Sequence, residues 1–422
     1  MNKFLIYLFF LVLLSNCSKN VKEENLNAEN IFKKSEPINR ELNSSLNIQL
    51  KKLTKGEPFY KNDSNNNGNI NFETNFKKTH SYKFKTINQF KIYQPELIFT
   101  NDQNIIFFDG KGSIFKINES LKEVWKVNYY NKKERKLKPI LYFAQNDQRL
   151  LITDTLSKLY SVNLFNGEIE WSKESKSAFN SNIKIYKDTF IAIDFDNVIR
   201  CFSVKDGKEL WTFKAENSFI KSQKKLSLII KGEMVFFNNN LGDITALNVN
   251  DGSLIWQTPT QSNLIYQNAF TLQISDLVFH KNSIFFSNNK NELFSIDARS
   301  GIVNWKQKVN SILRPTVIEN LIFSISEQGY LFVINSQTGN IARISYVLNN
   351  IKNKKNQIKP IGFIIAKNKI YLSLNNGSLV KINVATGVQE NIFKISASKI
   401  SRPYVINNNM YLIKDNGIIK SN

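Results

Sequence analysis

The chain has 422 residues, of which 42% are hydrophobic and 32 are phenylalanine, so it can bury a sizeable core and is not globally disordered. Its formal charge is +22 at pH 7, but the lysines are scattered along the whole sequence with no basic arm or helix, which argues against nucleic acid as a partner. Two cysteines and two histidines are too few for a disulfide framework or a zinc site of the usual Cys/His kind.

The first residues have the pattern of a secretion signal. Met1–Lys3 is a short positive segment, and residues 4–14 are an apolar run too short to span a bilayer as a helix. The run ends in Leu14-Ser15-Asn16-Cys17, which resembles a bacterial lipobox, although Asn16 stands where that pattern prefers Gly, Ala or Ser. We therefore predict a signal peptide over residues 1–16 and lipidation of Cys17. Ordinary secretion, with Cys17 as a bystander, is the alternative.

Residues 17–70 are predicted to be a lipidated, flexible tether, with a possible short helix near Leu42–Leu53. They are rich in Lys, Glu, Asn and Ser, and their apolar periodicity is weak. A flexible chain of this length would reach about 40 Å root-mean-square. Ser18 stands after Cys17 where an Asp would resemble an inner-membrane retention signal, so the resemblance favours the outer membrane.

A repeat with a period of about 40–50 residues fills most of residues 71–422. Each copy reads as an alternating strand, a turn of the form Asn/Asp-x-x-x-Gly, and a second strand that often ends in Trp. The clearest copy runs from Thr245 to Trp256. Aligned copies begin at Gly112, Ser157, Asn197, Gly242, Asn291, Gly329, Gly377 and Gly417. Several strands per unit at this period predict an all-β, eight-bladed propeller, or seven blades if the first copy is not a full blade.

The repeated residues have mechanical roles. Asn or Asp bonds the nearby backbone of the turn, and Gly supplies a positive φ angle. Trp packs a large ring while its N–H can still find a partner. Arg343 and Asn391 replace it in the last two full copies. The eighth copy is too short for a blade, so we predict that either Asn71–Glu73 or Ser81–Lys85 closes the ring and removes its exposed edges.

The repeat resembles the pyrroloquinoline-quinone-type (PQQ-type) propeller repeat, which occurs in quinoprotein dehydrogenases and in the BamB family of outer-membrane assembly factors. The lipobox, the propeller and the compact length together are similar to the BamB family. This resemblance implies a non-catalytic scaffold lipoprotein of the outer membrane that faces the periplasm. It also implies that the propeller binds the POTRA domains of a BamA-like barrel subunit, and that there is no enzyme activity, cofactor or metal.

The resemblance also implies partner-contact residues. By approximate alignment, apolar and basic contacts of the family fall at Phe219, Ile220 and Lys221, in the connection after Trp211. An acidic pair of the family falls near Thr271 and Gln273, where this sequence has no acid.

Two other functions stay open. A quinone-dependent dehydrogenase would need Ca²⁺ held by carboxylate and amide oxygens and an Asp base. We find no convincing set of this kind, no adjacent Cys pair and no other catalytic motif. Asp194 and Asp196 are predicted to lie on a solvated face. The second alternative is a propeller lipoprotein that binds another periplasmic client.

Overall fold

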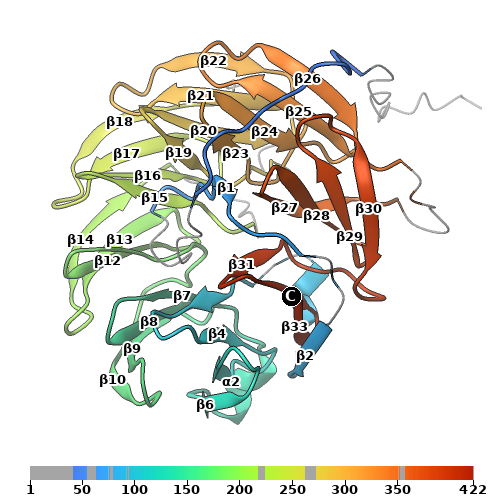
Figure 1. Cartoon of the computed structure of the whole chain (residues 1–422). Helices are drawn as coiled ribbons and strands as arrows, with labels where there is room; N and C mark the ends of the chain where they lie inside the picture. The colour runs from blue at the N-terminus through green and yellow to red at the C-terminus, as the bar shows by residue number, and fades with distance from the viewer. Residues whose placement is uncertain are drawn as a thin grey trace, which may run out of the picture. The chain divides into compact units, whose positions relative to one another are not determined.

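Eight β-sheets account for the repeat region in the computed structural model, which describes residues 41–54, 63–74, 76, 79–91, 93, 95–216, 224–261, 272–349, 351 and 357–421 (Figure 1). The described chain is all-β and forms an eight-bladed propeller, as the repeat predicted. The first copy is a full blade, so the eight-blade interpretation is the correct one.

The first four blades follow one another along the chain. Blade 1 contains β3 (Ile98–Phe99), β4 (Ile105–Phe108), β5 (Ile114–Ile117) and β6 (Glu123–Val127); blade 2 contains β7 (Leu141–Gln145), β8 (Arg149–Asp154), β9 (Lys158–Asn163) and β10 (Ile169–Glu174). Blade 3 contains β11 (Lys184–Tyr186), β12 (Thr189–Ile193), β13 (Val198–Ser203) and β14 (Glu209–Lys214); blade 4 contains β15 (Leu228–Lys231), β16 (Met234–Asn238), β17 (Ile244–Asn248) and β18 (Leu254–Thr258).

The last four blades repeat this order. Blade 5 contains β19 (Val278–His280), β20 (Ser283–Asn288), β21 (Glu292–Asp297) and β22 (Val303–Gln307); blade 6 contains β23 (Thr316–Ile318), β24 (Leu321–Ile325), β25 (Tyr330–Asn335) and β26 (Ile341–Tyr346). Blade 7 contains β27 (Pro360–Ala366), β28 (Lys369–Leu374), β29 (Ser378–Asn383) and β30 (Gln389–Lys394); blade 8 contains β31 (Tyr404–Ile406), β32 (Asn409–Lys414), β33 (Gly417–Ser421) and the N-terminal β2 (Thr79–Lys83). Helix α2 (Lys132–Lys136) joins blades 1 and 2, and the 3₁₀ helix η2 (Asn88–Lys91) precedes blade 1.

The four strands given above for each of blades 1 to 7 pair antiparallel in chain order, and in blade 8 the N-terminal β2 pairs antiparallel with the last strand, β33. The first strands of neighbouring blades contact one another from β7 through β11, β15 and β19 to β23. We call the first strand of each blade its inner strand, because these strands lie around the centre of the ring (Figure 1), and we call that centre the channel.

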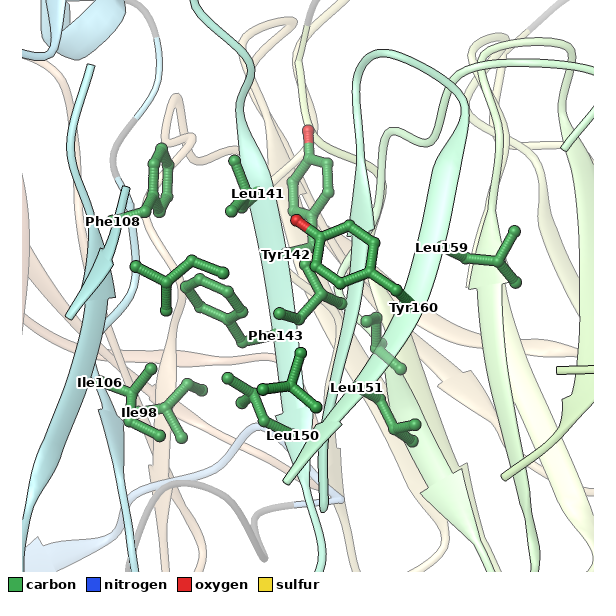
Figure 2. Close-up of a cluster of buried hydrophobic side chains, with 14 of the residues drawn as sticks. Ile98, Ile106, Phe108, Leu141, Tyr142, Phe143, Leu150, Leu151, Leu159 and Tyr160 are labelled. Carbon is green, nitrogen blue, oxygen red and sulfur yellow. The ribbon is translucent and has the colours of Figure 1, made fainter. Parts of the chain in front are cut away.

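The core lies between the blades, and the second and third strands of each blade are more buried than its outer strand. In β8, five of the six residues are buried, whereas in the outer strand β10 none is. Figure 2 shows how β4 of blade 1 faces β7 of blade 2, with Phe108 set against Phe143. These two rings pack edge to face with their centroids 5.9 Å apart. Each fully buried side chain of this size contributes roughly 1.5–3 kcal/mol of transfer free energy.

In blades 1 to 5 the repeat Trp joins the blade to the next one. Every indole N–H donates to a backbone carbonyl of the following blade at 3.0–3.2 Å: Trp125 to Leu164, Trp171 to Val204, Trp211 to Val249, Trp256 to Ala298 and Trp305 to Ser336. The turn glycine of the following blade rests on the same ring. At Gly252, with φ of +74°, an added Cβ would stand 2.5 Å from the ring of Trp211. Gly and Trp of the repeat are therefore partners across a blade interface.

Arg343 takes the place of the missing Trp between blades 6 and 7. Its Nη2 donates to the Val384 carbonyl at 2.6 Å, and Val384 follows the strand residue Asn383 as Val249 follows Asn248. Nη1 donates to the carbonyl of Leu46 at 3.0 Å and also to that of Ala385. Arg343 is fully buried. The hydrogen bond from one blade to the next is thus kept at this interface, although its donor is Arg and not Trp.

The ring is closed by strand β2. β2 pairs antiparallel with β33, the last strand of the chain, over Thr79↔Ser421 to Lys83↔Gly417. Of the two predicted closing segments, Ser81–Lys85 therefore overlaps the closing strand. Asn71–Glu73 follows β1 (Asn69–Ile70), which instead adds a parallel edge to β27 of blade 7.

The propeller unit begins earlier than the predicted boundary at residue 71. The described residues between 63 and 70 contact the inner strands of blades 4, 5, 6 and 7, one after another. The carbonyls of Asp63 and Ser64 accept from β15 and β19, the Asn66 side chain exchanges two hydrogen bonds with Val317 of β23, and β1 pairs with β27. We call residues 63–70 the rim segment.

Residues 41–54 also contact the propeller, and we call them the strap. Leu42 pairs with Ile344 of β26, Ile48 and Leu50 are buried, and Thr54 pairs with Ile70. The strap holds no helix among its residues, so the possible helix near Leu42–Leu53 is not formed. Its backbone bonds to the propeller instead, for example from Ile48 N to the Ala385 carbonyl at 3.0 Å. The tether prediction therefore remains for residues 17–40, which lie outside the described residues.

Candidate functional site

The predicted partner contacts belong to two neighbouring inter-blade connections. Phe219, Ile220 and Lys221 fall between β14 and β15, and Thr271 falls between β18 and β19; all four lie outside the described residues, as does Cys17. Gln273 is described and is exposed. Both the backbone N–H and the carbonyl of Gln273 are hydrogen-bonded to Asn289. Gln273 N donates to Asn289 Oδ1 at 2.9 Å, and the Gln273 carbonyl accepts from Asn289 N at 3.0 Å.

The described ends of these two connections lie together. Lys224 and Leu226 from the first connection and Leu272 and Ile274 from the second line one small cavity of about 10 Å³. Leu226, Leu272 and Ile274 are buried there. The described residues that follow the two predicted contact segments, at Lys224–Leu226 and Leu272–Ile274, therefore lie beside each other.

An ion network crosses the channel, and sequence reasoning missed it. Glu96 precedes blade 1, and its Oε1 accepts from Lys225 Nζ, before blade 4, at 3.0 Å and from Arg314 Nη2, before blade 6, at 3.3 Å. Arg314 Nε also donates to Asp276 Oδ2, before blade 5, at 2.8 Å. Blade 1 does not neighbour blade 4 or blade 6, so these bonds cross the centre of the ring.

Four charged residues before inner strands share one position in the repeat. Glu96, Asp276, Arg314 and Arg402 each stand two residues before the first residue of an inner strand. This regularity is a signal in the sequence, but it becomes visible only once the inner strands are placed. The repeat motif marks the later, Trp-bearing strands, and the short inner strands carry no motif of their own.

The network shifts the pKa values of its members. Burial alone would raise the pKa of Asp276, but Arg314 and Lys225 outweigh it and hold that pKa well below its usual range. The pKa of Glu96 is lowered in the same way, because Lys225 and Arg314 outweigh the effect of burial. Lys184, on β11, has its pKa lowered to about 8 by burial. Carboxylates of the network are therefore charged at neutral pH, as the ion pairs require.

Asp194 and Asp196 do not share the solvated face that the sequence predicted. Asp194 is fully buried at the β12–β13 turn, where its Oδ1 accepts from the backbone N–H of Asp196 and Val198. Its other oxygen accepts from the Arg200 guanidinium at 3.0 Å. The position is a turn and not the middle of a strand, so the carboxylate satisfies backbone donors.

The described residues hold no cluster of three or more His, Cys, Asp or Glu side chains that could bind a metal ion. Cys201 is buried, and burial raises the pKa of its thiol to about 11. No described helix is long and apolar enough to cross a membrane.

Comparison with known proteins gives one family match. The model of the family described as outer membrane protein assembly factor BamB matches residues 110–345, which is more than half of the chain. No curated protein matches the sequence.

Solved structures share the fold. BamB from Moraxella catarrhalis superposes with a TM-score of 0.63 at 15% identity, covering 82% of this chain and 100% of that chain. Quinohemoprotein alcohol dehydrogenase ADHIIG from Pseudomonas putida HK5 gives 0.58 at 8% identity, covering 81% and 75%. Sqt1 from Saccharomyces cerevisiae gives 0.60 at 12% identity, covering 82% and 99%. At such identities the likeness shows the propeller fold alone.

Proposed function

Since the chain belongs to the family of outer membrane protein assembly factor BamB, we propose that it is a lipid-anchored, non-catalytic scaffold of the outer-membrane assembly machinery. In this proposal the propeller faces the periplasm and binds the POTRA domains of a BamA-like barrel subunit. The family match over residues 110–345 is the observation that carries the proposal.

The two inter-blade connections are the proposed contact surface. Their described ends, at Lys224 to Leu226 and Leu272 to Ile274, are adjacent and anchored in the core. Two loops held at neighbouring buried ends can present one continuous surface while the blades below stay rigid. We propose that Phe219, Ile220 and Lys221 supply its apolar and basic contacts, and that Thr271 and Gln273 lie at its edge.

The proposed anchor is the lipidated Cys17. The first described residue, Glu41, bonds through its carboxylate to the Tyr346 N–H of β26 at 3.1 Å. The chain between Cys17 and Glu41 can span at most about 80 Å, and a flexible chain would average about 25–30 Å. This reach would place the propeller within the periplasm close to the membrane.

One experiment tests the anchor and the partner. The tagged full-length protein is expressed in its own envelope, crosslinked, fractionated and purified with its bound proteins. We expect the wild type in the outer-membrane fraction with the BamA-like subunit, and Cys17→Ser in the soluble fraction. Ile220→Asp or Lys221→Glu should weaken recovery of that subunit by about tenfold, as expected for contacts worth about 1–2 kcal/mol. Lys205→Glu, an exposed charge change on the β13–β14 turn, is the matched control.

The alternatives give different outcomes. A clean preparation that lacks the BamA-like subunit but enriches another envelope protein would contradict the assembly role and support a different client. Quinone-dependent alcohol oxidation by the purified protein would contradict the non-catalytic role. The pocket beside the ion network is too small for a quinone ring system, because its volume of about 70 Å³ is less than half of an engineered cavity of about 150 Å³ that accepts benzene.

A further inference from the structure

The connection between blades 1 and 2 contains a short basic helix, α2. Four of its five residues are lysine or arginine, and none of the five is buried. No basic helix was expected from the sequence, because lysines occur along the whole chain and hide this cluster. The structure therefore corrects that expectation and places a compact group of positive charges on the surface.

Contacts on the inner side of α2 hold it against both blades. Asn131 caps the helix, and the Glu134 carboxylate accepts in return from the Asn131 N–H at 2.9 Å. The other carboxylate oxygen of Glu134 accepts from Lys158 Nζ, on blade 2, at 2.6 Å. Arg135 Nε donates to the Tyr130 carbonyl at 2.7 Å. The helix therefore has a defined position before any partner binds, which lowers the entropic cost of binding.

The remaining lysines of α2 face solvent. Lys132, Lys133 and Lys136 are exposed, and no hydrogen bond or ion pair joins their ammonium groups to another residue in the described part of the chain. Leu137, which follows them, is 64% exposed. Like charges three or four residues apart destabilise a helix, so this arrangement costs stability that a bound negative charge would recover.

Positive charge is also in surplus around α2. The surroundings of the helix comprise residues 109–113 and 128–140, together with residues 154–158 and 174–176. They hold eight cations and four acids, a surplus of four positive charges: Lys111, Lys132, Lys133, Arg135, Lys136, Lys138, Lys158 and Lys176, against Asp109, Glu134, Asp154 and Glu174.

The four acids do not cancel the charge of the exposed lysines. Asp109 and Asp154 are buried and accept from backbone N–H groups of their own turns. Glu134 is bonded to blade 2 and to the helix cap, as described above. Glu174 is the one exposed acid of the four, and Lys176 offsets it two residues later.

α2 lies on the face of the propeller that carries the proposed partner contacts. Because the strands of a blade are antiparallel, the connections that follow the outer strands begin at the same end of every blade. α2 follows β6 as the two proposed contact connections follow β14 and β18. The described chain starts at blade 6, across the ring from α2, and a flexible tether there would average about 25–30 Å. A protein on this face is therefore favoured over the membrane surface.

We propose that α2 binds a short acidic segment of a partner protein. Lys132, Lys133 and Lys136 meet its carboxylates, and Leu137 packs against an apolar side chain beside them. Exposed charge pairs contribute little each, so three in one patch act mainly on the rate and specificity of docking. This surface is additional to the one in the proposed function, and it does not depend on which envelope protein carries the acidic segment.

The first test uses the detergent-solubilised full chain and, as the probe, a fluorescent peptide of alternating Glu and Ser. A peptide with Gln in place of Glu is the reference. We expect binding of the Glu peptide alone, weakening as salt rises. The triple variant Lys132→Glu, Lys133→Glu, Lys136→Glu should weaken it about tenfold, because three attractive contacts become repulsive.

A matched control variant has the same change in net charge elsewhere. Lys122→Glu, Lys205→Glu, Lys208→Glu alters exposed lysines in the β5–β6 and β13–β14 turns, at the opposite end of their blades. It should weaken peptide binding by less than about twofold, since screening limits the reach of distant charges. Equal losses in the two triple variants would overturn the proposal, because the overall positive charge would then explain the binding.

The stability of the unbound protein shows whether these lysines have a structural role instead. Lys132→Gln with Lys136→Gln removes a like-charge pair four residues apart, so its melting temperature should equal or exceed that of the wild type. A clear decrease would show that these lysines stabilise the propeller and would contradict the proposed docking role.

The second test is made in the native envelope. A photo-crosslinking amino acid in place of Leu137 should label a protein within an acidic segment, and the label should be lost in the α2 triple variant but kept in the control variant. Labelling of lipid alone, with binding to vesicles of phosphatidylglycerol and phosphatidylethanolamine but not to the peptide, would overturn the proposal in favour of a membrane contact. These outcomes are independent of the recovery of the BamA-like subunit, which Ile220→Asp tests.

Discussion

At the scale of single residues, Lys184 links the channel to pH. Its folded pKa of about 8 lies below that of an unfolded lysine, because burial outweighs the attraction of Asp63 and Glu96 and is reinforced by Arg314 and Lys225. The folded protein therefore binds fewer protons between about pH 8 and 10, and stability rises with pH in this window. Below about pH 8, where Lys184 is charged in the folded protein, its burial lowers the folding stability by the full amount.

A comparison with Lys184→Met measures this effect. The variant lacks the titrating group, so its melting temperature should exceed that of the wild type most at pH 7 and least at pH 9.5. We expect the difference to shrink by an amount on the order of 1–2 °C. The range stays below pH 10 because burial raises the pKa of channel tyrosines such as Tyr93 and Tyr404, which would act in the opposite direction. A constant difference across the range would contradict the shifted pKa.

Residue types in the repeat could be predicted from the sequence, but several of their partners could not. The sequence indicated that each repeat Trp would find a hydrogen-bond acceptor, and the indole of Trp211 does so. That Arg343 would reach the equivalent carbonyl was not predicted, because its motif had lost the Trp. The channel charges were missed because Glu96 and Arg314 meet across the ring and belong to no local pattern.

At the scale of elements, Arg343 and Trp305 should have different roles. Arg343 at the blade 6–7 interface also holds the strap, whereas Trp305 holds only the blade 5–6 interface. Arg343→Met would leave the carbonyl of the buried Val384, and that of Leu46, without this donor, at a cost of about 1–3 kcal/mol in unfolding free energy. It should also loosen the strap, since Leu46 belongs to it. Trp305→Phe removes one bond, to Ser336, and leaves the strap in place.

Denaturant unfolding and limited proteolysis would separate the two variants. Arg343→Met should lose stability and become cleavable within residues 41–54, whereas Trp305→Phe should lose stability without new cleavage there. Equal strap protection in both variants would show that Arg343 holds the blades together but not the strap.

The short inner strands and the strap explain where element prediction failed. β11, β19 and β23 have three residues each, too few to show an alternating pattern. The strap is polar and irregular, so its sequence resembles a tether. Only contacts with distant blades, such as that of Leu42 with Ile344, make it part of the propeller unit.

At the scale of the whole molecule, the pairing of β2 with β33 should determine global stability. His80 and Lys420 are Cα partners in this pair. A His80→Cys, Lys420→Cys variant, in a Cys17→Ser background, should form a disulfide that stabilises the oxidised protein by up to about 5 kcal/mol, because it closes a very long loop. Lys158→Cys with Glu174→Cys, partners within blade 2, is the control and should yield about 3 kcal/mol.

Melting temperatures of the oxidised and reduced forms of each variant check this prediction. The gain should vanish on reduction, and it should be larger for the ring-closing pair. Failure of the ring-closing disulfide to form, while the control disulfide forms, would contradict closure by β2.

Closure by β2 also determines when, during synthesis, the propeller can be completed. The outermost strand of blade 8 is made near the start of synthesis, but its partner β33 is made last. The backbone hydrogen-bonding groups of β2 stay unpaired until the rest of the chain has been made. A contact between residues so far apart in the sequence also forms slowly. A chain that crosses a membrane from its N-terminus would thus complete its propeller only on the far side, after its final residues had arrived. Until then β2 remains open to pairing with a strand of another chain, so the period between export and closure is when this fold is most exposed to aggregation.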